Sequence, residues 1–210
     1  KNKPQKVISN LTHLPDVPAQ PALIRKPPTI LMLTRMIETK GVHVLIEALH
    51  LLAQKNIFVR AIIAGEGELK AHYEKMVADY QLNDRVEFPG WVNSTQKVAL
   101  YQQADFIAVP SINDIQPLGI LDAFAWGKVV LSSDAIGPRQ ICEHQKNAWI
   151  TKAGDGEDLA QEIEYLINHP DMALQLAQQA KKEALERYCF AQVAKAQDSF
   201  VNEVYSHYHS

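Results

Sequence analysis

The sequence has few cysteines, no marked excess of charge of either sign and no long apolar run. Only Cys142 and Cys189 are cysteines among 210 residues, and they lack the spacing of a redox or metal-binding motif. A reduced, cytoplasmic protein is therefore expected. No apolar run approaches the roughly 20 residues that a helix needs to cross a bilayer.

Charge and histidine placement argue against two further classes of protein. The net charge of -3 disfavours a nucleic-acid-binding protein, which usually carries a basic surplus or stripe. The eight histidines are scattered, and only His207 and His209 lie close together, near the C-terminus. We therefore expect no nucleic-acid partner and no metal site.

Three motifs of nucleotide and nucleophile chemistry are missing as well. The sequence has no G-x-x-x-x-G-K-[ST] phosphate loop and no G-x-S-x-G nucleophile elbow. Gly65 and Gly67 form a G-x-G, but Lys70 stands where the dinucleotide fingerprint has its third glycine. These absences count against the commonest ATPases and hydrolases, and against an NAD-dependent dehydrogenase.

From residue 29 onward the sequence alternates between strand and helix patterns. Apolar runs predict strands at 30–34, 57–64, 85–88, 106–109, 129–131 and 148–150. Apolar residues at helical spacing predict helices between them, one of them capped by Ser94, and further helices towards the C-terminus. This alternation predicts an α/β fold, a Rossmann-like doubly wound parallel sheet with C-terminal helices.

The first 28 residues differ in composition from the rest. They hold six of the eleven prolines and one short strand-like run, Val7-Ile8-Ser9, which is the composition of a linker. We expect an interdomain strand and linker at 1–28, the Rossmann-like domain at 29–188 and a last helix at 189–210. A chain that starts in this way is expected to follow an upstream domain.

Candidate binding residues gather where the predicted strands end, because ligands of such folds bind beyond the carboxyl ends of the strands. Arg35 and Lys40 follow the first strand, and both could reach one phosphate group, arginine as a bidentate fork and lysine as a point charge. Two solvated surface cations are the alternative. Gly65 and Gly67 permit either a tight structural turn or the close approach of a ligand.

The stretch 111–127 combines two carboxylates with a predicted helix start. Asp114 is expected in the loop above the sheet, and Asp122 one turn into a helix that has Pro117 and Leu118 in its first turn. Both carboxylates can then face a ligand held at the helix N-terminus, where free N–H groups favour an anion. The alternative is an acidic bias that only complements the helix dipole.

Taken in order, these segments resemble the C-terminal, donor-binding domain of family 4 retaining glycosyltransferases, which have the two-domain GT-B fold. The likeness covers nearly all of residues 5–205 and rests on Thr34-Arg35 to Lys40-Gly41, Ala64-Gly65-Glu66-Gly67, Phe88-Pro89-Gly90-Trp91-Val92, Asp114 to Asp122, and Gly127-Lys128-Val129-Val130. It implies metal-independent, retaining hexosyl transfer from a UDP- or GDP-linked sugar without a cofactor, in polysaccharide, lipopolysaccharide or glycolipid assembly. It also implies an absent N-terminal acceptor domain, to which the last helix would cross back.

The resemblance gives the candidate residues their expected roles. Arg35 and Lys40 would hold the donor diphosphate and stabilise the departing nucleoside diphosphate, and Asp114 would meet the transferred sugar. These three are the expected catalytic residues. Asp122 would accept hydrogen bonds from the ribose, since a carboxylate offers two acceptor oxygens. The other expected donor-binding residues are Trp91 and Val92 at the base, Gly65 and Gly67 in the glycine turn, and Leu118, Gly119 and Ile120, whose N–H groups would meet the diphosphate.

The sequence departs from the family pattern in ways that keep alternatives open. Asp114 and Asp122 replace two glutamates and are each a methylene shorter, so that contacts can be rearranged or mediated by water. Arg139 follows Pro138 in place of the family's second glycine region, and is either a phosphate or sugar contact or a surface cation. The alternatives are a non-catalytic module with a degenerate donor site and another GT-B activity, such as a sugar epimerase or phosphorylase. The chain alone is expected to bind nucleotide weakly and transfer nothing, and peripheral association with the inner face of the membrane is left open.

Overall fold

The structure, a computed structural model, describes residues 10, 12, 24–115 and 117–209. Six parallel strands form one sheet in the order β3-β2-β1-β4-β5-β6. Their bounds are β1 Thr29–Leu33, β2 Arg60–Ala64, β3 Val86–Gly90, β4 Phe106–Val109, β5 Val129–Ser133 and β6 Trp149–Thr151. This is the strand order of the doubly wound Rossmann fold, so the predicted fold class is confirmed.

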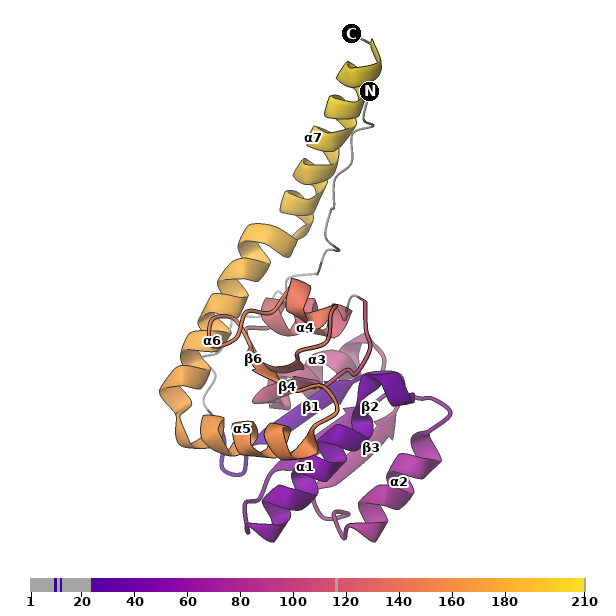
Figure 1. Cartoon of the computed structure of the whole chain (residues 1–210), viewed down its shortest axis with the longest axis vertical. Helices are drawn as coiled ribbons and strands as arrows, with labels where there is room; N and C mark the ends of the chain where they lie inside the picture. The colour runs from indigo at the N-terminus through magenta and orange to yellow at the C-terminus, as the bar shows by residue number, and fades with distance from the viewer. Residues whose placement is uncertain (1–9, 11, 13–23, 116, 210) are drawn as a thin grey trace.

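Helices connect the strands and cover both faces of the sheet (Figure 1). On one face lie α1 (Val42–Gln54), α2 (Lys70–Asp79) and α5 (Gly156–Asn168), and on the other α3 (Ser94–Gln103) and α4 (Leu118–Ala125). Successive residues of β1 alternate between the two cores, since Ile30 and Met32 face the first and Leu31 the second. Because the strands are buried on both faces, their sequences are apolar runs, and this made them recognisable.

The C-terminal part of the described chain is helical. It contains α6 (Pro170–Glu183), the π-helical turn η3 (Ala184–Tyr188) and α7 (Phe190–His209), which leaves the domain as a long arm (Figure 1). Two short 3-10 turns, η1 (Glu38–Lys40) and η2 (Pro138–Gln140), follow β1 and β5. No helix in the described ranges is long and apolar enough to span a membrane.

Three details of the predicted elements need correction. The N-cap of α3 is Asn93, which accepts a bond from the Gln96 N–H at 2.9 Å, and Ser94 is the first helical residue. The second strand begins at Arg60 and not at Ile57. The Ile57 N–H donates to the Leu52 carbonyl, so this residue takes part in the turn that ends α1. Pro117 is the N-cap of α4, which begins at Leu118.

The division of the chain into domains stays a prediction. The strand-like run at 7–9 lies outside the described residues. The long last helix predicted at 189–210 is present as α7. That it crosses back to an upstream domain stays a prediction.

Candidate functional site

The candidate site lies where the order of strands in the sheet reverses, between β1 and β4. These strands pair Ile30 with Phe106 and Leu31 with Ile107. Ligands of open α/β sheets bind beyond the carboxyl ends of the strands at such a point. Two adjoining cavities of about 260 and 570 Å³ open there, here named the first and the second cavity. They share Leu33, Thr34, Arg35 and Gly119, so one extended ligand can reach across both.

In the first cavity a lysine and an aspartate from distant parts of the chain form an ion pair. Lys40 Nζ lies 2.5 Å from Asp114 Oδ2, and the Asp114 side chain is only 11% exposed. They meet because η1 packs directly on the end of β4: a Cβ at Gly41 would lie 2.0 Å from the Pro110 carbonyl oxygen. Gly41 also has a φ of +72°, which favours glycine. The Ile112 N–H donates to the Thr39 carbonyl and completes the junction.

The loop that carries Asp114 is supported on its other side by the segment after β5. The Gly137 N–H donates to the Asp114 carbonyl oxygen at 3.0 Å, and a Cβ at residue 137 would lie 2.1 Å from that oxygen. Ser133 Oγ donates to the Ser111 carbonyl in the same loop. The glycine that the sequence keeps at position 137 is thus explained by close backbone packing.

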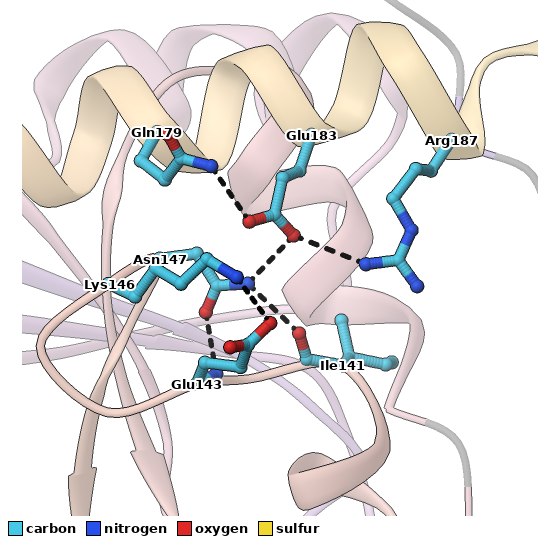
Figure 2. Close-up of polar contacts among 7 residues, drawn as sticks. All are labelled: Ile141, Glu143, Lys146, Asn147, Gln179, Glu183 and Arg187. Atoms are coloured by element: carbon cyan, nitrogen blue, oxygen red, sulfur yellow. Dashed lines mark hydrogen bonds and ion pairs between the residues drawn. The ribbon is translucent and has the colours of Figure 1, made fainter.

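Residues 141–147 follow η2, and a buried polar cluster attaches them to α6 (Figure 2). Asn147 is fully buried and donates from Nδ2 to Glu183 Oε2 at 2.9 Å and to the Ile141 carbonyl at 3.1 Å. Its Oδ1 accepts from the Glu143 N–H at 2.7 Å. Arg187 approaches the same Glu183 oxygen at 3.5 Å, so the buried carboxylate has a cationic partner. Because its polar groups are bonded, this cluster holds the turn 141–147 in place.

In the second cavity both oxygens of Asp122 have a partner. Lys97 Nζ lies 2.5 Å from Oδ2, and Thr12 Oγ1 donates to Oδ1 at 3.0 Å. The Lys97 ammonium is also 5.8 Å from the centroid of the Tyr101 ring. Burial, reinforced by the charge of Asp122, raises the pKa of Tyr101 well above its ordinary value. Its hydroxyl is therefore neutral, and it has no hydrogen-bond partner in the described part of the chain.

The two glycines of the G-x-G are explained by contacts with the chain that leaves β1. A Cβ at Gly65 would lie 1.8 Å from the Thr34 carbonyl oxygen, and one at Gly67 would lie 2.4 Å from the Met36 carbonyl oxygen. Gly65 also has a φ of +138°. The tight-turn interpretation therefore accounts for both glycines, although Gly65 lines the second cavity as well.

Most predicted site residues line the two cavities. The first cavity has Arg35, Lys40, Asp114, Leu118 and Gly119, and the second has Arg35, Gly65, Trp91, Val92, Gly119 and Asp122. Gly67 and Ile120 line neither. Ile120 is fully buried, and its N–H already donates to the Pro117 carbonyl at 3.1 Å. The roles expected of these residues stay predictions.

Arg35 differs from the two lysines of the cavities. Lys40 and Lys97 are each paired with an aspartate, whereas Arg35 is exposed and has no carboxylate partner within the described ranges. Arg139 is at another cavity, 3.7 Å from Asp134, and so lies apart from this group. Glu66, which also lines the second cavity, is paired with Lys70 at 2.7 Å, so Arg35 is the cavity cation without a carboxylate partner within the described ranges.

Sequence reasoning missed Lys97, Thr12 and Tyr101. Lys97 and Tyr101 are one turn apart on α3, and both line the second cavity. Thr12 belongs to the proline-rich segment and reaches Asp122 across 110 positions. The helical spacing of Lys97 and Tyr101 was the only signal, and it indicated a shared face without indicating what that face meets.

The family model of group 1 glycosyl transferases matches residues 15–183. The chain belongs to this glycosyltransferase family. The family that the order of motifs indicated is thereby confirmed.

A curated relative agrees with this assignment, and solved structures agree with the fold. The chain is 31% identical over 143 residues to the amylovoran biosynthesis glycosyltransferase AmsK of Erwinia amylovora, covering 65% of this chain and 35% of that protein. S. aureus TarM, crystallised as a mutant with fondaparinux, alpha-GlcNAc-glycerol and UDP, superposes with a TM-score of 0.81 and 24% identity over 94% of this chain and 39% of that one. Anabaena HepE in complex with UDP-glucose gives a TM-score of 0.74 and 24% identity over 85% and 48%. The chain thus spans less than half of the length of each of these proteins, and the two structures bear on the fold alone.

Proposed function

We propose that this glycosyltransferase chain is the donor-binding half of a metal-independent enzyme that transfers a hexosyl unit, with retention, from a UDP- or GDP-linked sugar. The carrying observation is the uncompensated Arg35 at the junction of the two cavities, between the Lys40–Asp114 and Lys97–Asp122 pairs. A donor diphosphate at this junction would meet the guanidinium, which binds phosphate oxygens bidentately.

The two cavities suit the two ends of such a donor. In the second cavity Asp122 can accept bonds from ribose hydroxyls, and the exposed ring of Trp91 offers a flat apolar surface to a base. In the first cavity Asp114 and Ser111 present oxygens beside Lys40, and these can hydrogen-bond to sugar hydroxyls. The larger second cavity would then hold the nucleoside and the smaller first cavity the sugar.

The expected chemistry depends on negative charge that grows on the departing nucleoside diphosphate. Arg35 and Lys40, with the N–H groups of Leu118 and Gly119 at the start of α4, would stabilise this charge in the transition state. These groups would do the work that a divalent cation does in other transferases. The retaining outcome is inferred from the family resemblance.

The wider setting of the reaction is inferred from the relatives. TarM was crystallised with UDP and HepE with UDP-glucose, and AmsK is named for amylovoran biosynthesis. We infer a nucleotide-sugar donor, an N-terminal acceptor domain in the complete protein, and a part in assembling a polysaccharide, lipopolysaccharide or glycolipid. We also infer a cytoplasmic location, in reach of membrane-bound acceptors, and a reaction that needs no cofactor.

Calorimetric titration of the chain with UDP, GDP and NAD tests the proposal. We expect weak but measurable binding of UDP or GDP, and no binding of NAD. Tight binding of NAD with no response to the other two nucleotides would contradict the proposal.

A non-catalytic module is the second candidate, and one observation favours it. Both Asp114 and Asp122 are already paired with lysines, so each carboxylate has fewer acceptor positions left for a donor than an unpaired carboxylate would have. Donor hydrolysis by the complete protein separates the two functions. An enzyme is expected to hydrolyse donor and to lose this activity on Asp114→Ala but not on Asp134→Ala, a carboxylate outside both cavities. No hydrolysis by any of the three proteins would favour the module.

A further inference from the structure

We propose that Thr12 is a positioning residue for Asp122 and thereby sets the affinity of the site for a nucleoside. The inference rests on the proposed function, because it concerns the carboxylate expected to hold the ribose. Thr12 itself does not line either cavity, so it is expected to act only through Asp122.

Thr12 is held in place from two sides. Its N–H donates to the Tyr188 carbonyl at 2.9 Å, and its Oγ1 donates to Asp122 Oδ1 at 3.0 Å. The residue is only 3% exposed. Because threonine is branched at Cβ, its χ1 has few accessible rotamers, so a fixed backbone also fixes the direction of the hydroxyl. The hydroxyl is therefore a rigid donor aimed at one oxygen of the carboxylate.

The other partner of Asp122 is much less constrained. The Lys97 side chain is 41% exposed, and its ammonium carries three N–H groups on a long flexible stem. Lysine alone could draw the carboxylate into several orientations. A carboxylate with Thr12 on Oδ1 and Lys97 on Oδ2 is instead fixed at both oxygens.

Fixing the carboxylate leaves it able to bind a ligand. Two carboxylate oxygens offer about four acceptor positions, so the Thr12 and Lys97 bonds use two and leave the others for the hydroxyls of a ribose. Without the Thr12 hydroxyl, Oδ1 would face an apolar group, and the carboxylate would turn towards Lys97 to recover a partner. The acceptor oxygens would then be misplaced for a vicinal diol.

The same residue connects the site to the helical arm of the molecule. Tyr188 is the last residue of η3, two positions before α7 begins at Phe190. Thr12 thus joins the Asp122 carboxylate to Tyr188, close to the point at which α7 begins. A shift of this junction would be transmitted to Asp122 through one hydroxyl.

Three variants of the chain test the inference by calorimetry with UDP and with inorganic pyrophosphate. Thr12→Val removes the hydroxyl and keeps the shape, whereas Thr12→Ser keeps the hydroxyl. Thr151→Val is the matched control, because Thr151 is also 3% exposed and donates from Oγ1 to the Ser132 carbonyl at 3.2 Å, outside both cavities. We expect Thr12→Val to weaken UDP binding about tenfold, with pyrophosphate binding changed less than about twofold. Thr12→Ser and Thr151→Val should retain the affinity for UDP.

A double-mutant comparison shows whether Thr12 acts through the carboxylate. In an Asp122→Ala background, Thr12→Val should weaken UDP binding no further. An unchanged affinity in Thr12→Val, an equal loss for UDP and pyrophosphate, or a persistent effect in the Asp122→Ala background would each overturn the inference. If the unmodified chain binds neither UDP nor GDP, the proposed function fails and the inference fails with it. If the chain binds only GDP, the same series is read with GDP.

Discussion

At the scale of single residues, each carboxylate of the two cavities has a lysine partner, Lys70 in the case of Glu66, whereas Arg35 has no carboxylate partner within the described ranges. Lys40 is paired with Asp114 and Lys97 with Asp122, each at an N–O distance of 2.5 Å. The more exposed Lys97–Asp122 pair contributes only about 0–1 kcal/mol to stability, so it can open at little cost when a ligand arrives. Arg35 lines both cavities, and under the proposed function it would hold the diphosphate.

The first prediction concerns this arginine. Arg35→Met should weaken the binding of both UDP and pyrophosphate about tenfold or more, because a bidentate bond from arginine to phosphate is lost. Arg139→Met is the control, since Arg139 also follows a strand but lies at a different cavity beside Asp134. Calorimetry measures both. Equal losses in the two variants would mean that overall charge, and not this position, decides the affinity.

The second prediction concerns Gly137. Gly137→Ala should lower the affinity for UDP-glucose more than that for UDP. The new Cβ would lie 2.1 Å from the Asp114 carbonyl oxygen and would therefore displace the loop that carries Asp114. Gly154→Ala is a control for general destabilisation: it has a φ of +78° but nothing within 4 Å of an added Cβ. Comparing the two ligands in fluorescence or calorimetric titrations gives the ratio. If the ratio of the affinities for UDP-glucose and UDP is unchanged in Gly137→Ala, the Asp114 loop does not contact the sugar.

At the scale of elements, helix α3 depends on its capping box. Asn93 accepts from the Gln96 N–H, and Gln96 accepts from the Asn93 N–H, each at 2.9 Å. Asn93→Ala should lower the free energy of unfolding by about 1 kcal/mol, whereas Ser94→Ala should leave it nearly unchanged. Urea unfolding measures both variants. A larger loss of unfolding free energy in Ser94→Ala than in Asn93→Ala would mean that Ser94 is the N-cap, as the sequence pattern indicated.

Asp105 joins the amino ends of β1 and β4, and we expect its contribution to stability to depend on pH. Asp105 Oδ2 accepts from the Thr29 N–H at 2.8 Å, and Arg25 lies 3.2 Å from Oδ1. Burial raises the pKa of Asp105 above its ordinary 3.8, although these hydrogen bonds and the charge of Arg25 act in the opposite direction. The folded protein therefore holds this proton more tightly than the unfolded chain does.

The sign of the pH effect follows from that difference. Stability from this group is fully present below the unfolded pKa of 3.8 and is lost as the pH rises through the higher folded pKa. Relative to Asp105→Asn, which does not titrate, the unmodified protein should lose stability between pH 3.8 and neutral pH. Urea unfolding of both proteins across this range measures it, with exposed Asp84→Asn as the control. A difference that grows in favour of the unmodified protein with rising pH would contradict the expectation.

At the scale of the whole molecule, the proposed function gives this chain the donor site and leaves the acceptor site to another part of the complete protein. Its arm α7 exposes apolar side chains, with Phe190 68% and Val201 64% exposed. We expect the complete protein to release nucleoside diphosphate from a UDP- or GDP-sugar when acceptor is supplied, and this chain alone to release none. Chromatography of the products measures both reactions. Transfer by the chain alone would show that the upstream part is dispensable.

Local pattern in the sequence was enough to predict the alternation of strands and helices. Burial on both sheet faces leaves apolar runs such as 106–109, and helices on a sheet leave a 3.6-residue period, so each element carries its own mark. The pattern also placed Arg35, Lys40 and Asp114 after the carboxyl ends of strands, and Asp122 one turn into the helix that follows. These features depend on neighbours in sequence, and the sequence by itself determined them.

Only the tertiary structure decided which of these groups meet. Lys97 reaches Asp122 because α3 and α4 pack on the same face of the sheet, and Thr12 reaches it across 110 positions. Contacts between distant segments depend on how the layers pack, and the sequence pattern around each residue carries no record of its partner.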